Sequence, residues 1–127
     1  MKRKILVLED EENIRSFLVL NLKRSGYEVI EAETGEIALE KYHENQDIAV
    51  AVLDVMLPGL DGIELLRRMK ADAALREIPV IMATAKGAEY DKIQGLDLGA
   101  DDYLAKPFGS REFLASLVSA LKRHQKI

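Results

Sequence analysis

The chain has 127 residues and carries 18 Lys and Arg against 22 Asp and Glu, which gives a formal net charge of −4. This length suits one domain, and a composition of 48% hydrophobic and 31% charged residues excludes an intrinsically disordered chain. Cysteine is absent, which excludes a disulfide framework, a thiol nucleophile and a thiolate metal site.

The N-terminal run "MKRKILVLEDEEN" has a basic tip, but its apolar part is too short for a signal peptide or a membrane span. The acidic balance disfavours direct nucleic-acid contact, because affinity for phosphates depends on Lys and Arg. We therefore expect a cytoplasmic protein that contacts neither membrane nor nucleic acid. The expected domain covers residues 1–127, with its core over roughly 3–124 and no effector domain in this chain.

Three apolar runs predict buried strands at Ile5–Leu8, Ile48–Leu53 and Val80–Ala83. They are rich in Ile, Val and Leu with little alternation, which is typical of parallel strands covered on both faces. Weaker strands are expected at Tyr27–Ala32 and Asp102–Ala105.

Helical spacing of apolar residues predicts a helix around Ile14–Leu22 and another around Phe113–Leu121. Intermediate helices fit Gly35–Glu44, with Thr34 as its cap, and Gly62–Lys70, with Asp61 as its cap. Strand and helix thus alternate, which predicts an α/β domain with an open, doubly wound parallel sheet.

The segment Lys86–Leu98 is the weakest predicted helix, since it contains Gly87 and Gly95. Its obvious buried pair is Ile93 and Leu96. A helix with so few apolar anchors should be among the easiest elements to shift.

Polar residues follow the predicted strands at the edge where open α/β sheets bind their ligands. Glu9 and Asp10 follow the first strand, Asp54 the third, Thr84 the fourth and Lys106 the fifth. We therefore expect three carboxylates, a hydroxyl and an ammonium group at one edge of the sheet.

These carboxylates would repel one another, so Lys106 and a divalent cation are expected to balance them. Oxygen ligands favour Mg²⁺, or Mn²⁺ in its place. A carboxylate facing a phosphate donor can form an aspartyl-phosphate, and Asp54 is the best candidate because it ends the most apolar strand. Lys106 would neutralise the phosphoryl oxygens, and Thr84 could donate a hydrogen bond to one of them.

In this order and on these elements, four motifs resemble those of bacterial two-component response-regulator receiver (CheY-like) domains over essentially the whole chain. They are "LVLEDEENIR", "AVLDVMLPGLDGIELLRRM", "VIMATAK" and "GADDYLAKPF". The resemblance implies a flavodoxin-like five-stranded sheet of order 2-1-3-4-5, an order for which the CheY family is a known example. It also implies a phosphoprotein that assists its own phosphorylation and slow dephosphorylation, with a sensor histidine kinase or phosphotransfer protein as its partner.

The resemblance assigns metal-site roles by position. Asp54 matches the phospho-acceptor, which also binds Mg²⁺, and Asp10 matches the acidic residue that binds the metal directly. Glu9 matches a neighbour that reaches the metal through water, although many relatives have Asp there. Met56 matches the position whose backbone carbonyl completes the metal site.

The same resemblance assigns the residues that respond to the phosphoryl group. Thr84 and Lys106 match the switch hydroxyl and the phosphate-pairing lysine, and Tyr103 matches an aromatic residue that moves inward on activation. The peptide between Lys106 and Pro107 is commonly cis in this family.

The stretch "KIQGLDLGADDYLAKPF" and the Glu9–Asp10 pair resemble the OmpR/PhoB-type receivers, which implies a homodimer through the fourth helix, fifth strand and fifth helix. Ser116 stands where that subfamily usually has Arg, so one intersubunit pair should be missing. The expected dimer face comprises Lys92, Asp97, Asp101, Asp102, Glu112 and Arg123.

Three alternative functions are to be weighed against this prediction. A haloacid-dehalogenase-type phosphohydrolase would need a second Asp where Met56 stands, and a flavodoxin-like FMN carrier would need a phosphate loop where "EDEEN" would repel phosphate. A degenerate receiver that only docks partners is disfavoured by the intact acids, Thr84 and Lys106. Singly, each of these residues has a structural explanation, such as packing for Tyr103.

Overall fold

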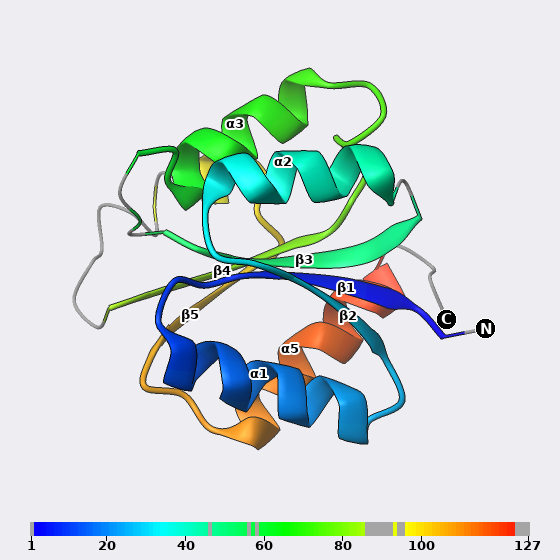
Figure 1. Ribbon diagram of the computed structural model, residues 1–127, viewed down its shortest axis with the longest axis vertical. Coiled ribbons are helices and arrows are strands. Elements are labelled where there is room, and N and C mark those ends of the chain that lie inside the picture. Colours follow the sequence, from blue (N-terminus) through cyan, green and yellow to red (C-terminus); the bar gives the residue numbers. More distant parts are fainter. Residues whose placement is uncertain are drawn as a thin grey trace.

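The computed structural model is shown in Figure 1, and it describes residues 2–45, 47–55, 57, 59–85, 93 and 96–123. Within these residues, the strands form a parallel sheet in the order β2-β1-β3-β4-β5, which confirms the predicted order. The strands are β1 (Lys4–Leu8), β2 (Glu28–Ala32), β3 (Ile48–Asp54), β4 (Val80–Ala85) and β5 (Asp102–Lys106).

Helices cover both faces of this sheet, as the strand–helix alternation predicted. Helices α2 and α3 lie on one face, and α1 and α5 lie on the other (Figure 1). They are α1 (Glu12–Arg24), α2 (Gly35–Glu44), α3 (Gly62–Ala71) and α5 (Ser110–Arg123).

The central strand β3 is buried at every position, which explains why its sequence shows no polar alternation. Its side chains point alternately to the two faces. Leu53 packs in the core cluster beneath α2 and α3, together with Met69. Val52 packs in the second cluster, beneath α1 and α5, together with Phe113.

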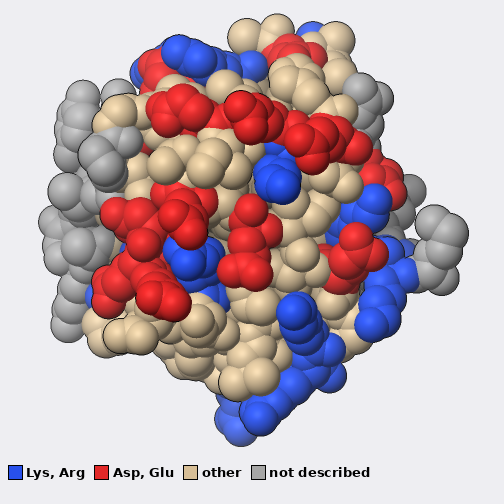
Figure 2. All heavy atoms as spheres, viewed as in Figure 1, with Lys and Arg blue, Asp and Glu red and all other residues tan. Residues whose placement is uncertain are grey.

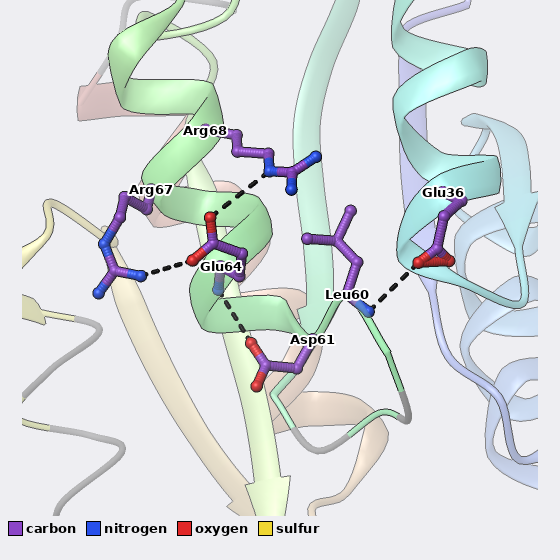
Figure 3. A network of polar contacts seen from close by, with 6 residues as sticks. All are labelled: Glu36, Leu60, Asp61, Glu64, Arg67 and Arg68. Atoms are coloured by element: carbon purple, nitrogen blue, oxygen red, sulfur yellow. Dashed lines mark hydrogen bonds and ion pairs between the residues drawn. The ribbon is translucent and has the colours of Figure 1, made fainter.

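Two predicted helix caps are present, and they fix how the chain enters α2 and α3. The Thr34 hydroxyl accepts a hydrogen bond from the Ile37 N–H at 3.1 Å. An Asp61 carboxylate oxygen accepts one from the Glu64 N–H at 2.9 Å, as Figure 3 shows. Such caps satisfy backbone donors that the first helical turn leaves free. Asp61 is therefore engaged as a cap at the start of α3.

A second contact in Figure 3 ties α2 to the segment that leads into α3. A Glu36 carboxylate oxygen accepts a hydrogen bond from the Leu60 N–H at 3.2 Å. Gly59, just before Leu60, has φ +74°, a conformation that glycine adopts at little cost. The connection after β3 is thus held from α2 as well as from its own helix cap.

The weakest predicted helix lies largely outside the described residues, which omit 86–92, 94 and 95. Ile93 and Leu96 are helical, but they are 60% and 42% exposed, so their prediction as a buried pair is wrong. Leu98 and Ala100 pack against the cluster beneath α2 and α3 instead. The segment that leads into β5 therefore contributes apolar side chains to the core beneath α2 and α3.

Candidate functional site

The strand register brings the predicted site residues to one edge of the sheet. Leu8 pairs with Leu53, so Glu9 and Asp54 follow at the same level of neighbouring strands. Asp54 pairs with Ala83, so Thr84 lies one residue further along β4. The last pair of β4 and β5 includes Lys106.

Three carboxylates meet at this edge. Glu9, Asp10 and Asp54 each offer a carboxylate oxygen, and these atoms lie within 4.8 Å of one another. Glu9 is 1% exposed and Asp54 is 4% exposed, whereas Asp10 is exposed to solvent. Ionised carboxylates this close and this buried are unfavourable unless positive charge or hydrogen bonds compensate them.

Lys106 supplies part of that compensation. Its Nζ lies 2.7 Å from a Glu9 carboxylate oxygen and 3.3 Å from an Asp54 carboxylate oxygen. Burial acts to lower the pKa of Lys106, but the hydrogen bond to Glu9 and the charges of Asp54 and Glu9 outweigh it and raise this pKa. The lysine is therefore charged at neutral pH and is shared between two acids.

Glu9 is bonded through all its polar atoms. One carboxylate oxygen accepts from Lys106, and the other accepts from the Glu11 N–H at 3.1 Å. Its backbone N–H donates to the Ala32 carbonyl at 3.1 Å, and its carbonyl accepts from Arg15 at 2.9 Å. Glu9 thus fixes the turn between β1 and α1.

Thr84 is a buried polar residue at this edge. It is 1% exposed, and its hydroxyl has no hydrogen-bond partner among the described residues. A buried polar group left unpaired costs about 1–3 kcal/mol. An anionic ligand at this edge, such as a phosphoryl group, would give the hydroxyl an acceptor.

The donor set also suits a hard divalent cation. Glu9, Asp10 and Asp54 offer only oxygen ligands, which Mg²⁺ prefers, and the exposed Asp10 leaves an approach from solvent. Lys106 balances only one charge of this cluster. Met56, whose carbonyl was predicted as a further ligand, lies outside the described residues.

Gly62 supports the site in a way that the sequence analysis missed. A Cβ at this position would lie 2.9 Å from the carbonyl carbon of Asp54 and closer still to its oxygen. The Gly62 N–H donates to the Val55 carbonyl at 3.2 Å. The first turn of α3 therefore packs directly against the backbone of Asp54. The one signal of this contact in the sequence is the glycine that follows the helix cap Asp61.

We expect Gly62→Ala to lower the free energy of unfolding by about 1–3 kcal/mol, because the added methyl would displace the backbone of Asp54. Helix propensity alone would predict that the free energy of unfolding rises by up to about 1 kcal/mol. The sign of the measured change therefore tests the close contact. Urea unfolding measures the change. Gly109→Ala, where a Cβ meets nothing within 4 Å, is the control and should be neutral or stabilising. A stabilised Gly62→Ala variant would contradict the contact.

An apolar pocket of about 270 Å³ lies beside Lys106, between α1 and the connection from β5 to α5. The peptide between Lys106 and Pro107 in that connection is cis, as the resemblance implied. The pocket is lined by Asn13, Ile14, Phe17, Lys106, Pro107 and Phe108.

Tyr103, predicted as a switch residue, is half-buried and packs against the cluster beneath α2 and α3.

The residues predicted for a dimer face are used partly within the chain. The Ser116 hydroxyl donates to an Asp102 carboxylate oxygen at 2.5 Å, and Arg123 donates to the Asp101 carbonyl at 3.0 Å. Asp97 and Glu112 are exposed, whereas Lys92 lies outside the described residues. Ser116 thus gives Asp102 a hydrogen-bond partner within the chain.

The doubly wound sheet carries two buried acids and a lysine at its carboxyl edge, which is the arrangement that the resemblance to receiver domains implied. Residues 5–118 match the response regulator receiver domain family, and the chain belongs to this family, whose members serve two-component systems. No helix in the described part of the chain has both the length and the apolar character to cross a membrane.

The chain is similar to known response regulators in sequence and structure. It is 49% identical over 125 residues to the alkaline phosphatase synthesis transcriptional regulatory protein PhoP of Bacillus subtilis (strain 168). The match covers 98% of this chain but 51% of that relative, so the chain spans about half of its length.

Two solved structures have the same fold. A response regulator from Chloroflexus aurantiacus J-10-fl, described as putative, is 35% identical with a TM-score of 0.91, covering 96% of this chain and 99% of that one. The chemotaxis protein CheY4 of Vibrio cholerae is 29% identical with a TM-score of 0.88, covering 95% of this chain and 100% of that one.

Proposed function

We propose that this receiver domain is a phosphorylation-controlled switch in which Asp54 accepts a phosphoryl group from a histidine kinase or phosphotransfer protein. The observation that carries the proposal is the Asp54 carboxylate, almost buried at the end of β3, with Lys106 Nζ at 3.3 Å and two further acids beside it. A carboxylate in this setting can act as a nucleophile without a second catalytic base.

In the proposed step, an Asp54 carboxylate oxygen attacks phosphorus, a P–O bond forms and the P–N bond of the phosphohistidine breaks. The electron pair of the P–N bond stays on the imidazole nitrogen, and the histidine leaves as neutral imidazole because its other ring nitrogen carries a proton. Mg²⁺, held by Asp10, Asp54 and the Met56 carbonyl, with Glu9 reached through water, would neutralise charge on the transferred oxygens. Slow hydrolysis of the same acyl phosphate would reset the domain.

Lys106 and Thr84 would then stabilise the product. Lys106 is charged and lies between Glu9 and Asp54, so it can pair with a phosphoryl oxygen with a small movement of its long side chain. The buried Thr84 hydroxyl would donate to another phosphoryl oxygen and so gain the partner that it lacks. Movement of Thr84 would make room for Tyr103 to turn inward, which would couple the phosphoryl group to β5.

The phosphodonor would dock beside the site. The apolar pocket between α1 and the β5–α5 connection borders Lys106, so a partner seated there would bring its phosphohistidine to Asp54. Phosphorylation would change the surface of the fourth helix, β5 and α5, which we propose as a homodimer face or the contact for an output partner. The output would be carried by a longer regulator or by a separate partner protein, and we also propose a cytoplasmic location.

Mass spectrometry with acetyl phosphate and Mg²⁺ tests this function. We expect the protein to gain the mass of one phosphoryl group, Asp54→Asn to gain none, and chelation of the metal to prevent the gain. Asp61→Asn is the matched control, because Asn can also cap α3, and it should be labelled normally. Full, persistent labelling of Asp54→Asn would refute the assignment, and many turnovers on a small phosphoester would indicate a phosphohydrolase instead.

A further inference from the structure

We infer that Arg15 is a positioning residue for the metal site, because its side chain holds the peptide that leads from Glu9 into Asp10. The inference rests on the proposed function, since it concerns the metal that the acids would bind. Arg15 lies on α1, and its side chain is only 13% exposed although it is an arginine.

Arg15 contacts the backbone of the residue before Asp10. Arg15 Nη1 donates to the Glu9 carbonyl oxygen at 2.9 Å. Because a peptide group is planar, holding this oxygen also fixes the direction in which the chain continues to the Cα of Asp10. Asp10 is exposed, so the backbone, and not side-chain packing, sets where its carboxylate is presented.

Two acidic side chains hold the guanidinium of Arg15 in place. Its Nε lies 3.3 Å from a Glu31 carboxylate oxygen, and its Nη2 lies 3.6 Å from a Glu33 carboxylate oxygen. Glu31 belongs to β2, Glu33 lies just after β2, and Glu9 lies just after β1. The guanidinium of Arg15 therefore joins α1 to the ends of both strands. Figure 2 shows acidic side chains on the part of the surface where Figure 1 places α2 and β2.

Arg15 acts on the metal site through the position of the backbone and not through its charge. A positive charge near a cation site would weaken metal binding if charge alone mattered, but the charge of Arg15 is offset by Glu31 and Glu33. Three different nitrogens of the planar guanidinium make the three contacts. A lysine, with a single ammonium group, cannot reproduce this arrangement.

The test is metal binding by Arg15→Met and Arg15→Lys, each measured far below its melting temperature. Free Mn²⁺ is counted by electron paramagnetic resonance, and Mg²⁺ is titrated in competition. Groups that orient metal ligands typically change metal affinity by about tenfold or more when removed, so we expect both variants to bind about tenfold more weakly. Backbone amide exchange at Asp10 and Glu11 should become faster, while exchange in β3 stays unchanged.

Arg67→Met is the matched control, because Arg67 pairs with Glu64 of its own helix at 2.7 Å, and its affinity for Mn²⁺ should equal that of the parent. Unchanged affinity in both Arg15 variants, or tighter binding by Arg15→Met, would overturn the inference and leave the proposed function intact. A parent protein that binds neither metal would overturn the inference together with the metal assignment in the proposed function.

Discussion

Replacing Lys106 with methionine is expected to lower the free energy of unfolding by about 3–5 kcal/mol at neutral pH, the range for removing one partner of a buried ion pair. The substitution would leave Glu9, which is 1% exposed, and the nearly buried Asp54 without their shared cation. Millimolar Mg²⁺ should restore part of the loss, because the metal would supply positive charge to the same acids. Urea unfolding with and without Mg²⁺ measures both effects.

Two comparisons show whether the loss comes from the buried acids. Lys4→Met removes an ion pair of 3.2 Å with Asp47, whose side chain is 59% exposed, and should cost less than about 1 kcal/mol. Combining Lys106→Met with Glu9→Gln should recover stability relative to Lys106→Met alone, since no ionised Glu9 then remains unpaired. A Lys106→Met variant as stable as Lys4→Met would show that the buried pair is not a source of stability.

The same variant should alter the response to alkaline pH. The pKa of Lys106 is raised above its ordinary value of 10.5 in the folded protein. Its stabilising contribution is therefore complete below pH 10.5 and is lost as the pH rises through the folded pKa. Burial also raises the pKa of Tyr42, so both the parent and Lys106→Met lose some stability from this tyrosine as the pH rises. Above pH 10.5 the parent should lose stability more steeply than Lys106→Met.

The fold and the edge that carries the site could be predicted because both depend on short sequence patterns. The residues of β3 lack polar alternation, as a strand buried on both faces requires, and Asp54 ends that strand. Parallel strands end at one edge, so the sequence alone places Glu9, Thr84 and Lys106 near Asp54. The caps Thr34 and Asp61 follow from equally local rules.

The features that sequence patterns did not predict depend on how distant elements meet. The approach of Gly62 to Asp54 depends on how α3 is seated on β3, and the contact of Arg15 with Glu31 depends on the rotation of α1 against β2. The bond from Ser116 to Asp102 requires the register of α5 on β5. None of these three contacts produces a repeating pattern in the sequence. Each joins two residues at a separation in the chain that no helix or strand period sets.

Thr84→Val should act in opposite directions on the unmodified and the phosphoryl-like states. In the unmodified protein, the substitution removes a buried hydroxyl that lacks a partner among the described residues, so we expect the free energy of unfolding to rise by about 1–3 kcal/mol. With Mg²⁺ and beryllofluoride as a phosphoryl mimic, the parent gains a charge-assisted hydrogen bond from this hydroxyl, which contributes about 1.5–3 kcal/mol. The variant cannot gain it. Urea unfolding with and without the mimic gives both values.

Thr34→Val distinguishes this opposition from a general change in stability. Thr34 caps α2, so losing its hydroxyl should cost about 0.5–2 kcal/mol equally in both states and leave the stabilisation by the mimic unchanged. A Thr84→Val protein whose two states shift by the same amount would make Thr84 an ordinary strand residue. Opposite shifts would show that the Thr84 hydroxyl finds its hydrogen-bond partner in the phosphoryl group. The hydroxyl would then lower the stability of the unmodified protein and raise that of the phosphorylated one, which is a trade between stability and function.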